Sequence, residues 1–227
     1  MKTTGGDEKV KQKAGEAAAK LAENEMTVGL GTGSTAAHAV RALGKRVNEG
    51  LDIQAIPTSY QSADLVREAG IPVVTLDDAT PDLAIDGADQ IAGFDLIKGG
   101  GAAHTKEKLV DSAAERFVVV ADSSKEIELF NHPVPLEILP SARTPVSAAV
   151  QDLGGEPKLR SAECKDGPVV TDNGNLLLDC KFGRIENPGE LAGELSGIPG
   201  VVDHGLFVGL ADEIFVGTDE GVEERRR

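Results

Sequence analysis

The sequence predicts an α/β protein in which a mostly parallel sheet is covered by helices, followed by a second, smaller α+β domain. The first observation is an alternation of helix and strand signals that continues to about residue 130, a pattern typical of βα units. The second is a change at Asn131-His132-Pro133-Val134-Pro135, where prolines interrupt the apolar sequence. The third is a hairpin signal followed by a helix signal before residue 204, the order of a small α+β unit.

The first region has three predicted helices and three predicted strands, assigned from apolar periodicity and from start and stop signals. The helices are expected over residues 8–23, 36–48 and 59–69. The strands are expected over residues 27–30, 52–57 and 73–76. This order predicts strands that run parallel, because each helix returns the chain to the same end of the sheet.

The second region begins with the prolines and contains one hairpin and one helix. The segments 169–171 and 176–179 flank the turn Asp172-Asn173-Gly174-Asn175, which predicts a hairpin. Pro188 opens a predicted helix that extends to Leu195, because proline fits the first helical turn. The tail 219–227 mixes both charges around a single apolar residue, so we expect it to be frayed.

The run Gly29-Leu30-Gly31-Thr32-Gly33-Ser34-Thr35 joins a predicted strand to a predicted helix. Glycines permit a sharp turn with inward amides, the hydroxyl groups add donors, and a helix N-terminus favours negative charge. The run therefore predicts a phosphate cradle, although such turns also serve tight packing alone. It has neither the Gly-Lys-Ser/Thr ending of the nucleotide P-loop nor the third glycine of the dinucleotide fingerprint.

Two further clusters follow apolar segments and are expected where strands end. They are Asp86-Gly87-Ala88-Asp89 and Lys98-Gly99-Gly100-Gly101-Ala102-Ala103. Ligands of open α/β sheets bind beyond the carboxyl ends of the strands, so the three clusters could converge on one pocket. Glu107 lies at the start of the next predicted helix, which makes it a candidate proton-transfer base.

These motifs, in this order, resemble those of the ribose-5-phosphate isomerase type A family. The resemblance includes Lys11, the segment 121–125 that ends in Lys125, and the segment 205–210, so it covers nearly the whole chain. It implies a Rossmann-like sheet domain made of residues 1–130 and 205–227, with residues 131–204 as the small domain. In that arrangement the chain returns to the first sheet through segments 206–210 and 213–216.

The resemblance also implies an activity, the interconversion of D-ribose 5-phosphate and D-ribulose 5-phosphate through an enediolate in the non-oxidative pentose phosphate pathway. Its catalytic residues would be Glu107 as base, Lys98 near the developing oxyanion, and Asp86. The implied substrate-binding residues are Lys11, Thr32, Gly33, Ser34, Thr35, Asp86, Gly87, Ala88, Asp89, Lys98, Gly99, Gly100, Gly101 and Lys125. No metal or cofactor is implied, and we expect a homo-oligomer, a dimer or a tetramer.

Each assignment has a structural alternative. An isolated Asp-Gly pair such as Asp86-Gly87 usually shapes a turn. Glu107 could complement the helix dipole, and Lys11 and Lys125 could be ordinary surface lysines. Two other functions stay open at this point: a sugar-phosphate-binding regulatory module without turnover, and a CoA-transferase-like enzyme with a nucleophilic glutamate. Isomerisation without CoA would separate them.

Composition narrows the class of protein. No apolar run approaches a membrane span and the N-terminus has no apolar signal core, so we expect a cytoplasmic protein. Cys164 and Cys180 lack metal-ligand spacing, and the four histidines are scattered. The net charge of −15 opposes nucleic-acid binding. The 38 acidic residues are dispersed along the chain, and only 3% of the residues are aromatic. This composition favours an acidic surface adapted to salt over an ordinary acidic protein.

Overall fold

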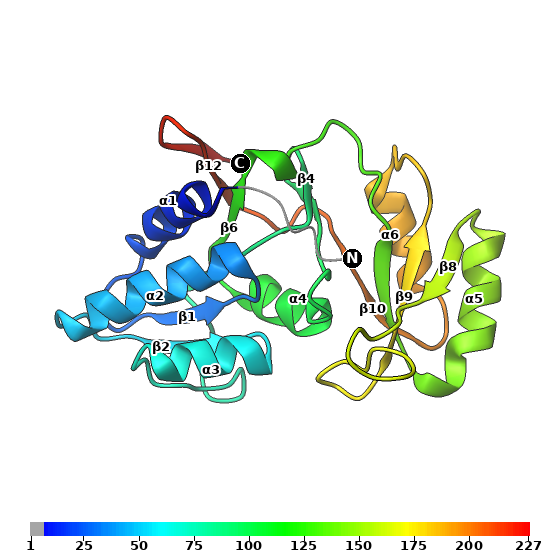
Figure 1. The fold of residues 1–227 in the computed structure, drawn as a ribbon, viewed down its shortest axis with the longest axis horizontal. Helices are drawn as coiled ribbons and strands as arrows, with labels where there is room; N and C mark the ends of the chain where they lie inside the picture. The colour runs from blue at the N-terminus through cyan, green and yellow to red at the C-terminus, as the bar shows by residue number, and fades with distance from the viewer. Residues whose placement is uncertain (1–6) are drawn as a thin grey trace.

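The computed structural model describes residues 7–227, which form three sheets (Figure 1). The largest has six strands in the order β13-β12-β6-β3-β1-β2. All neighbouring pairs are parallel except β12 with β13. These strands are β1 (Thr27–Leu30), β2 (Gln54–Pro57), β3 (Leu83–Asp86), β6 (Phe117–Asp122), β12 (Glu213–Gly217) and β13 (Val222–Arg226). The predicted α/β fold with a mostly parallel sheet is confirmed.

Three helices pack side by side along this sheet (Figure 1). They are α1 (Glu8–Ala19), α2 (Ser34–Asn48) and α3 (Tyr60–Glu68). Asp7 caps α1 by accepting a hydrogen bond from the Lys9 amide, and Ser59 caps α3 in a capping box with Ser62. The buried faces of α1 and α2 are rich in alanine, and these small side chains allow the helices to pack close to the sheet.

The second region builds a four-stranded antiparallel sheet in the order β10-β7-β9-β8 (Figure 1). Its apolar core is separate from that under α1 and α2. Pro188 occupies the first turn of α6, as predicted. The elements are β7 (Val134–Ile138), α5 (Arg143–Asp152), β8 (Glu156–Leu159), β9 (Leu176–Lys181), α6 (Pro188–Ser196) and β10 (Val201–His204). A short 3₁₀ turn, Pro140–Ala142, precedes α5.

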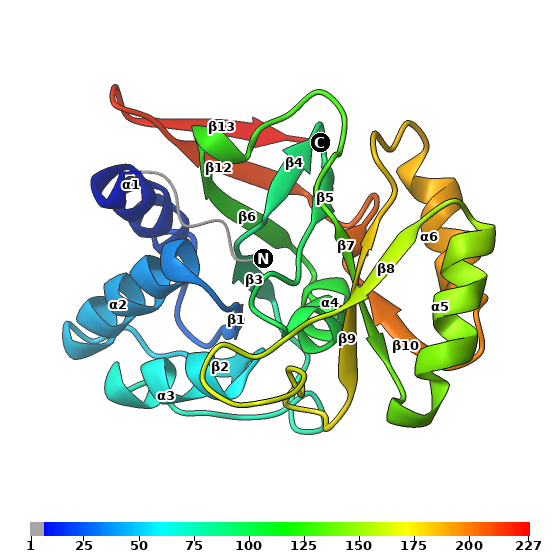
Figure 2. The same cartoon turned by 45° about the vertical axis from the view of Figure 1, so that its right-hand side comes forward.

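A small three-stranded sheet with the order β11-β5-β4 lies between these two units (Figure 2). It consists of β4 (Gln90–Ala92), β5 (Asp95–Ile97) and β11 (Leu206–Phe207). Helix α4 (His104–Ala113) follows β5 and contacts both β3 and β10. The two clusters therefore follow strands of two different sheets. Gly87 follows β3, a strand of the parallel sheet, whereas Lys98 follows β5, a strand of the small antiparallel sheet. The expectation that both clusters end strands of one open sheet was wrong in that respect.

Several local expectations need correction. Segment 73–76 is not a strand and forms only a single bridge from Val73 to Ala55, because it runs exposed along the sheet edge and turns at Thr75, which is bonded to Asp78. Segment 206–207 pairs with β5 and does not join the parallel sheet. The return through segment 213–216 is confirmed as β12.

The C-terminal tail is ordered, contrary to expectation. Strand β13 pairs with all five residues of β12, so the backbone ladder holds a segment that has little apolar surface to bury. Arg226 adds an ion pair to Glu213 at 3.3 Å.

In the predicted hairpin, the first arm is reduced to a bridge from Val170 to Leu176. Helix α1 ends at Ala19 and does not extend to residue 23. Within residues 7–227 no helix is long and apolar enough to cross a membrane.

Candidate active site

A cavity opens at the carboxyl ends of β1 and β3, beside the loop after β5. All predicted site residues except Asp86 line it, and Ala36 joins them. The lining comprises Lys11, Thr32, Gly33, Ser34, Thr35, Ala36, Gly87, Ala88, Asp89, Lys98, Gly99, Gly100, Gly101, Glu107 and Lys125. Residues from 11 to 125 thus meet in one place although they belong to α1, α2, α4, a 3₁₀ turn and the loops between the elements.

The first wall is the turn between β1 and α2. Gly31 must be glycine here, because a Cβ atom would lie 1.8 Å from Oδ1 of Asp86. Gly33 has a φ of +129°, a backbone conformation that other residues rarely adopt. No side chain of the described residues caps α2. Its first amide groups therefore face the cavity end of the helix and favour an anion.

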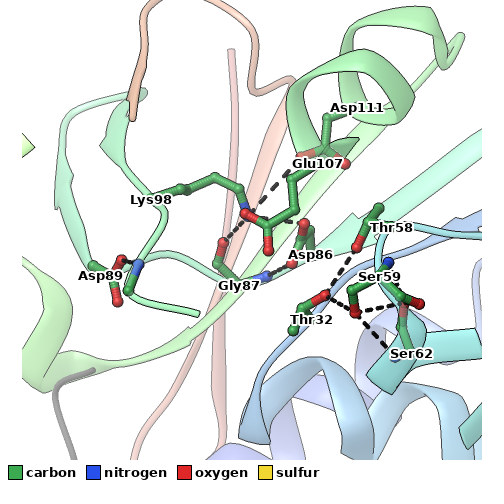
Figure 3. A network of polar contacts seen from close by, with 11 residues as sticks. Thr32, Thr58, Ser59, Ser62, Asp86, Gly87, Asp89, Lys98, Glu107 and Asp111 are labelled. Atoms are coloured by element: carbon green, nitrogen blue, oxygen red, sulfur yellow. Dashed lines mark hydrogen bonds and ion pairs between the residues drawn. The ribbon is translucent and has the colours of Figure 1, made fainter. Parts of the chain in front are cut away.

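The hydroxyl group of Thr32 is already engaged by the protein (Figure 3). It donates to Ser59 Oγ at 2.7 Å and lies 3.1 Å from the Thr58 hydroxyl. Because Ser59 caps α3, this network ties the turn to the start of α3. The structure thus gives the Thr32 hydroxyl a bracing contact, and leaves Ser34 and Thr35 as the other hydroxyl residues of the turn.

Lys98 is the centre of the second wall (Figure 3). Its Nζ lies 2.8 Å from Asp86 Oδ2 and 3.4 Å from Glu107 Oε2, and it donates to the Gly87 carbonyl at 2.5 Å. The side chains of Asp86, Lys98 and Glu107 are all at most 4% exposed. Asp86 does not reach the cavity surface but lies beneath it, paired with the lysine. A buried cation is thereby fixed against the carboxyl group that lines the cavity.

Burial sets the charge states of this centre. Desolvation raises the pKa of Glu107 to about 8, the Asp86 carboxylate adds to the rise, and Lys98 opposes it. Desolvation likewise raises the pKa of Asp86, again opposed by Lys98. For Lys98, desolvation lowers the pKa, but the carboxylates of Asp86 and Glu107 outweigh it, so the pKa lies above its ordinary value and the amine stays charged. Glu107 is consequently able to exchange a proton near neutral pH.

Asp111 is a residue that the sequence reasoning missed. It lies one helical turn after Glu107 on α4, its side chain is 1% exposed, and Lys98 Nζ lies 4.0 Å away. Neither carboxyl oxygen has a hydrogen-bond partner among the described residues. Desolvation raises its pKa well above the ordinary value. The spacing of four residues from Glu107 was the available signal, because such residues share a helix face.

The glycine loop after Lys98 is braced from both sides. Asp89 Oδ2 accepts from the Gly100 amide at 2.6 Å (Figure 3). On the other side, Arg160 donates to the carbonyl groups of Gly99 and Gly100 at 2.9 and 3.3 Å. Arg160 was also missed, and no local pattern reveals it, since it follows β8 about sixty residues later in the chain.

The two remaining candidates, Lys11 and Lys125, reach the cavity from other elements. Lys11 reaches the cavity from α1 and pairs with Glu8 at 3.0 Å, and Lys125 reaches it from the 3₁₀ turn Ser123–Lys125. His104 is buried away from the cavity lining, and desolvation lowers its pKa to about 4. Among residues 7–227, no group of three or more His, Cys, Asp or Glu side chains is arranged to hold a metal ion.

A mostly parallel sheet with an anion cradle, a buried lysine and a carboxyl group of raised pKa at its carboxyl edge defines an α/β enzyme of the acid–base type. The sequence profile of Ribose 5-phosphate isomerase A (phosphoriboisomerase A) matches residues 54–221. The ribose-5-phosphate isomerase A of Natronomonas pharaonis is 64% identical over 99% of this chain and its own full length. That of Haloarcula marismortui is 60% identical over 97% of each chain.

Solved structures agree with these relatives. The ribose 5-phosphate isomerase A of Methanocaldococcus jannaschii superposes with a TM-score of 0.94 at 43% identity, covering 98% of this chain and all of that one. A D-ribose-5-phosphate isomerase in complex with phospho-erythronic acid has the same TM-score at 40% identity and the same coverage. The chain belongs to the ribose-5-phosphate isomerase A family. It is an isomerase of ribose 5-phosphate and ribulose 5-phosphate, which decides against a regulatory module or a CoA-transferase.

Proposed function

We propose that Glu107 is the base that carries the proton between the two carbons of the isomerisation. The observation that carries this proposal is a buried carboxyl group on the cavity wall with a pKa raised to about 8, held 3.4 Å from the Lys98 ammonium. A base of this pKa takes a carbon-bound proton more readily than an ordinary glutamate, and still returns it near neutral pH. The intermediate is an enediolate.

Lys98 and the glycine loop stabilise the negative charge that develops on the substrate oxygen. The Lys98 ammonium is buried, and Gly99, Gly100 and Gly101 line the cavity. The Gly100 amide donates to Asp89, so the amides of Gly99 and Gly101 are the ones that bind the substrate oxygen. Asp86 holds Lys98 in place and charged, and has its catalytic role through that contact. Asp89, on the cavity wall, binds a sugar hydroxyl together with the Gly87 and Ala88 backbone.

The phosphate is held at the first wall of the cavity. The helix N-terminus formed by Thr32, Gly33, Ser34 and Thr35 favours an anion, and Lys11 and Lys125 add positive charge. A relative at 40% identity is bound to phospho-erythronic acid, which carries a phosphate at one end and a carboxyl group at the other. Such a ligand suits a cavity with two walls that both attract negative charge.

Glu107→Gln tests the proposed base. The amide keeps the shape but cannot accept a carbon-bound proton, so turnover should fall by about 10²–10⁴ while substrate still binds. Exchange of deuterium from solvent into the substrate carbon next to the carbonyl reports the same step independently. The exposed Glu115, which follows α4 and does not line the cavity, provides the matched control Glu115→Gln, which should behave as the native enzyme. Native exchange rates in Glu107→Gln would transfer the role to another residue.

We further propose that the enzyme works without a metal ion, in the cytoplasm, and as a homo-oligomer of two or four chains. Lys98 supplies the positive charge that a divalent ion would otherwise provide. Exposed Leu139 and Val202 offer apolar surface for contact between copies. Activity that is lost on chelation and restored by one divalent ion refutes metal independence. Sedimentation of a monomer at assay concentration refutes the oligomer.

The acidic composition belongs to this proposal as an adaptation to salt. Repulsion among carboxylates at a net charge of −15 weakens when the Debye length falls from about 10 Å at 0.1 M to about 3 Å at 1 M salt. The melting temperature should therefore rise with potassium chloride. A melting temperature that does not change over that range contradicts the adaptation.

We also propose that residues 131–204 form a small domain beside a catalytic domain of residues 1–130 and 205–227. Two separate apolar cores support this division. Ile97 and Leu206 from the three-stranded sheet pack into the second core, so the two parts share an apolar contact. Limited proteolysis that cuts first near residues 131 and 204 would support the boundaries, and first cuts inside the four-stranded sheet would refute them.

A further inference from the structure

Arg160 joins the four-stranded sheet to the glycine loop of the site. It follows β8, its side chain is only 11% exposed, and it does not line the cavity. Its Nη1 donates to the carbonyl oxygens of Gly99 at 2.9 Å and Gly100 at 3.3 Å. These two bonds lie on the side of the loop away from the Asp89 carboxylate. Arg160 therefore contacts the loop from behind.

Asp179 holds the guanidinium in this position. Arg160 Nε donates to Asp179 Oδ2 at 2.9 Å and Nη2 donates to Oδ1 at 2.5 Å, a two-pronged pair. Desolvation acts to raise the pKa of Asp179, but the bonds from Arg160 outweigh it and the pKa lies below its ordinary value. The carboxylate therefore stays ionised, and the third donor of the fork is aimed at the loop.

The peptide units of the loop transmit this contact to the cavity. The carbonyl of Gly99 and the amide of Gly100 belong to one trans peptide unit, so they point in opposite directions. Arg160 binds the carbonyl end, and Asp89 accepts from the amide end at 2.6 Å. In the next unit Arg160 binds the Gly100 carbonyl, which directs the Gly101 amide away from Arg160. A cation at a carbonyl polarises the peptide and strengthens its N–H as a donor.

We propose that Arg160 is a positioning residue of the isomerase: with Asp89 it fixes the Gly99–Gly100 peptide, and it orients and polarises the Gly100–Gly101 peptide so that the Gly101 amide stabilises the oxyanion. This inference rests on the proposed role of the glycine loop and adds a residue from the small domain to it. Arg160 follows β8 and Asp179 lies on β9, so residues of the small domain hold the contact with the glycine loop. The phosphate wall lies on α2 and receives no contact from Arg160 among the described residues.

The test compares Arg160→Met, Arg160→Lys and Asp179→Asn with the control Arg116→Met. Arg116 also forms a short pair with a carboxylate, Glu213, but at the amino ends of β6 and β12. Arg160→Met should lower turnover about 10- to 100-fold, with the KM for ribose 5-phosphate within about threefold of native. Arg160→Lys keeps the charge and should lose less turnover than Arg160→Met. Asp179→Asn should lose turnover in the same direction, and Arg116→Met should keep it.

Two inhibitors separate a polarising role from a general loss of structure. Binding of phospho-erythronic acid should weaken in proportion to turnover, whereas inhibition by inorganic phosphate should stay native, because only the first ligand carries a second anionic group. Equal losses in Arg160→Met and Arg160→Lys, or equal weakening of both inhibitors, overturn the inference. If Arg160→Met does not fold, native turnover in both Arg160→Lys and Asp179→Asn overturns it. Native turnover in Glu107→Gln would instead refute the proposed function.

Discussion

The two glycine-rich walls of the cavity are held in different ways. The first, residues 31–35, is built from one continuous segment between β1 and α2, and its shape follows from a glycine packed against Asp86 and a helix that begins at once. The second, residues 98–101, follows a short strand and takes its shape from distant side chains. The first wall is one continuous segment that is braced by its neighbours, whereas the residues that shape the second wall come from several separate parts of the chain.

This difference corresponds to the different functions of the two walls, phosphate binding and proton transfer. A phosphate needs only fixed amide donors and positive charge, which one helix N-terminus supplies. Proton transfer needs charges placed to within a fraction of an ångström, and the second wall achieves this by burying Lys98 among three carboxyl groups from β3 and α4. Substitutions that remove charge at the second wall should therefore reduce turnover most. Substitutions at the first wall should reduce turnover by displacing the turn that binds the phosphate.

The largest effect is expected when the charge of the second wall is removed. Lys98→Met keeps most of the side-chain length but takes away the buried ammonium, so turnover should fall about 10²–10³-fold. Steady-state rates of ribose 5-phosphate conversion measure this, with melting curves as a check of folding. Lys106→Met, the same change on α4 outside the cavity lining, should keep native rates. Native turnover in Lys98→Met would remove the lysine from the mechanism.

The addition of a single methyl group should disrupt the first wall. In Gly31→Ala the added Cβ would overlap the Asp86 carboxylate at 1.8 Å, so the turn or Asp86 must move by more than 1 Å. Such overpacking costs about 1–3 kcal/mol, and a displacement of this size at a site costs about 10²-fold in rate. Turnover and chemical denaturation together test the prediction. Gly193→Ala, on α6 with open space around it, should be as active as native and at least as stable.

What the sequence could predict follows the same division. The first wall was predictable because its glycines, hydroxyl groups and helix start occupy consecutive positions. Lys98 and Glu107 were found through the family motifs, but their burial was not, since it depends on α4 packing between β3 and β10. Asp111 shares a helix face with Glu107, but that spacing does not show that it faces Lys98. Arg160 was missed because no local pattern shows that it contacts the glycine loop.

The same limit explains the errors in the fold. Segment 73–76 has the β-branched residues of a strand, but the sheet offers it a single bridging partner at its edge. Strand β13 has a polar sequence and is nevertheless ordered, because β12 presents a complete row of backbone groups for pairing. In both cases the available hydrogen-bonding edge decided the outcome, and this edge exists only once the sheet has formed.

A smaller effect is expected in the pH dependence of the rate. Glu107 must be ionised to act as a base, and burial raises its pKa to about 8, so kcat/KM should climb roughly tenfold per unit as pH rises toward about 8 and then level off. An exposed glutamate would give a plateau from about pH 5. Initial rates from pH 5 to 9 in buffers of constant ionic strength measure the profile. A plateau that begins at pH 5 would show that the effect of Lys98, which lowers the pKa of Glu107, outweighs the effect of desolvation, which raises it.

The smallest predicted effect concerns stability at Asp111, behind the second wall. Its pKa is raised in the folded protein, so above pH 4 the unfolded chain releases the proton while the folded protein keeps it. Stability from this group is complete at low pH and is lost as pH rises toward the folded pKa. Asp111→Asn removes this loss, so its melting temperature relative to native should increase between pH 5 and 8, by about 2–4 °C for each 1 kcal/mol. Asp77→Asn, which neutralises an exposed carboxylate, is the matched control for the loss of one negative charge. A difference from native that stays constant with pH for Asp111→Asn would mean that the Asp111 carboxyl group titrates alike in the folded and unfolded chain, and that Lys98 compensates for its burial.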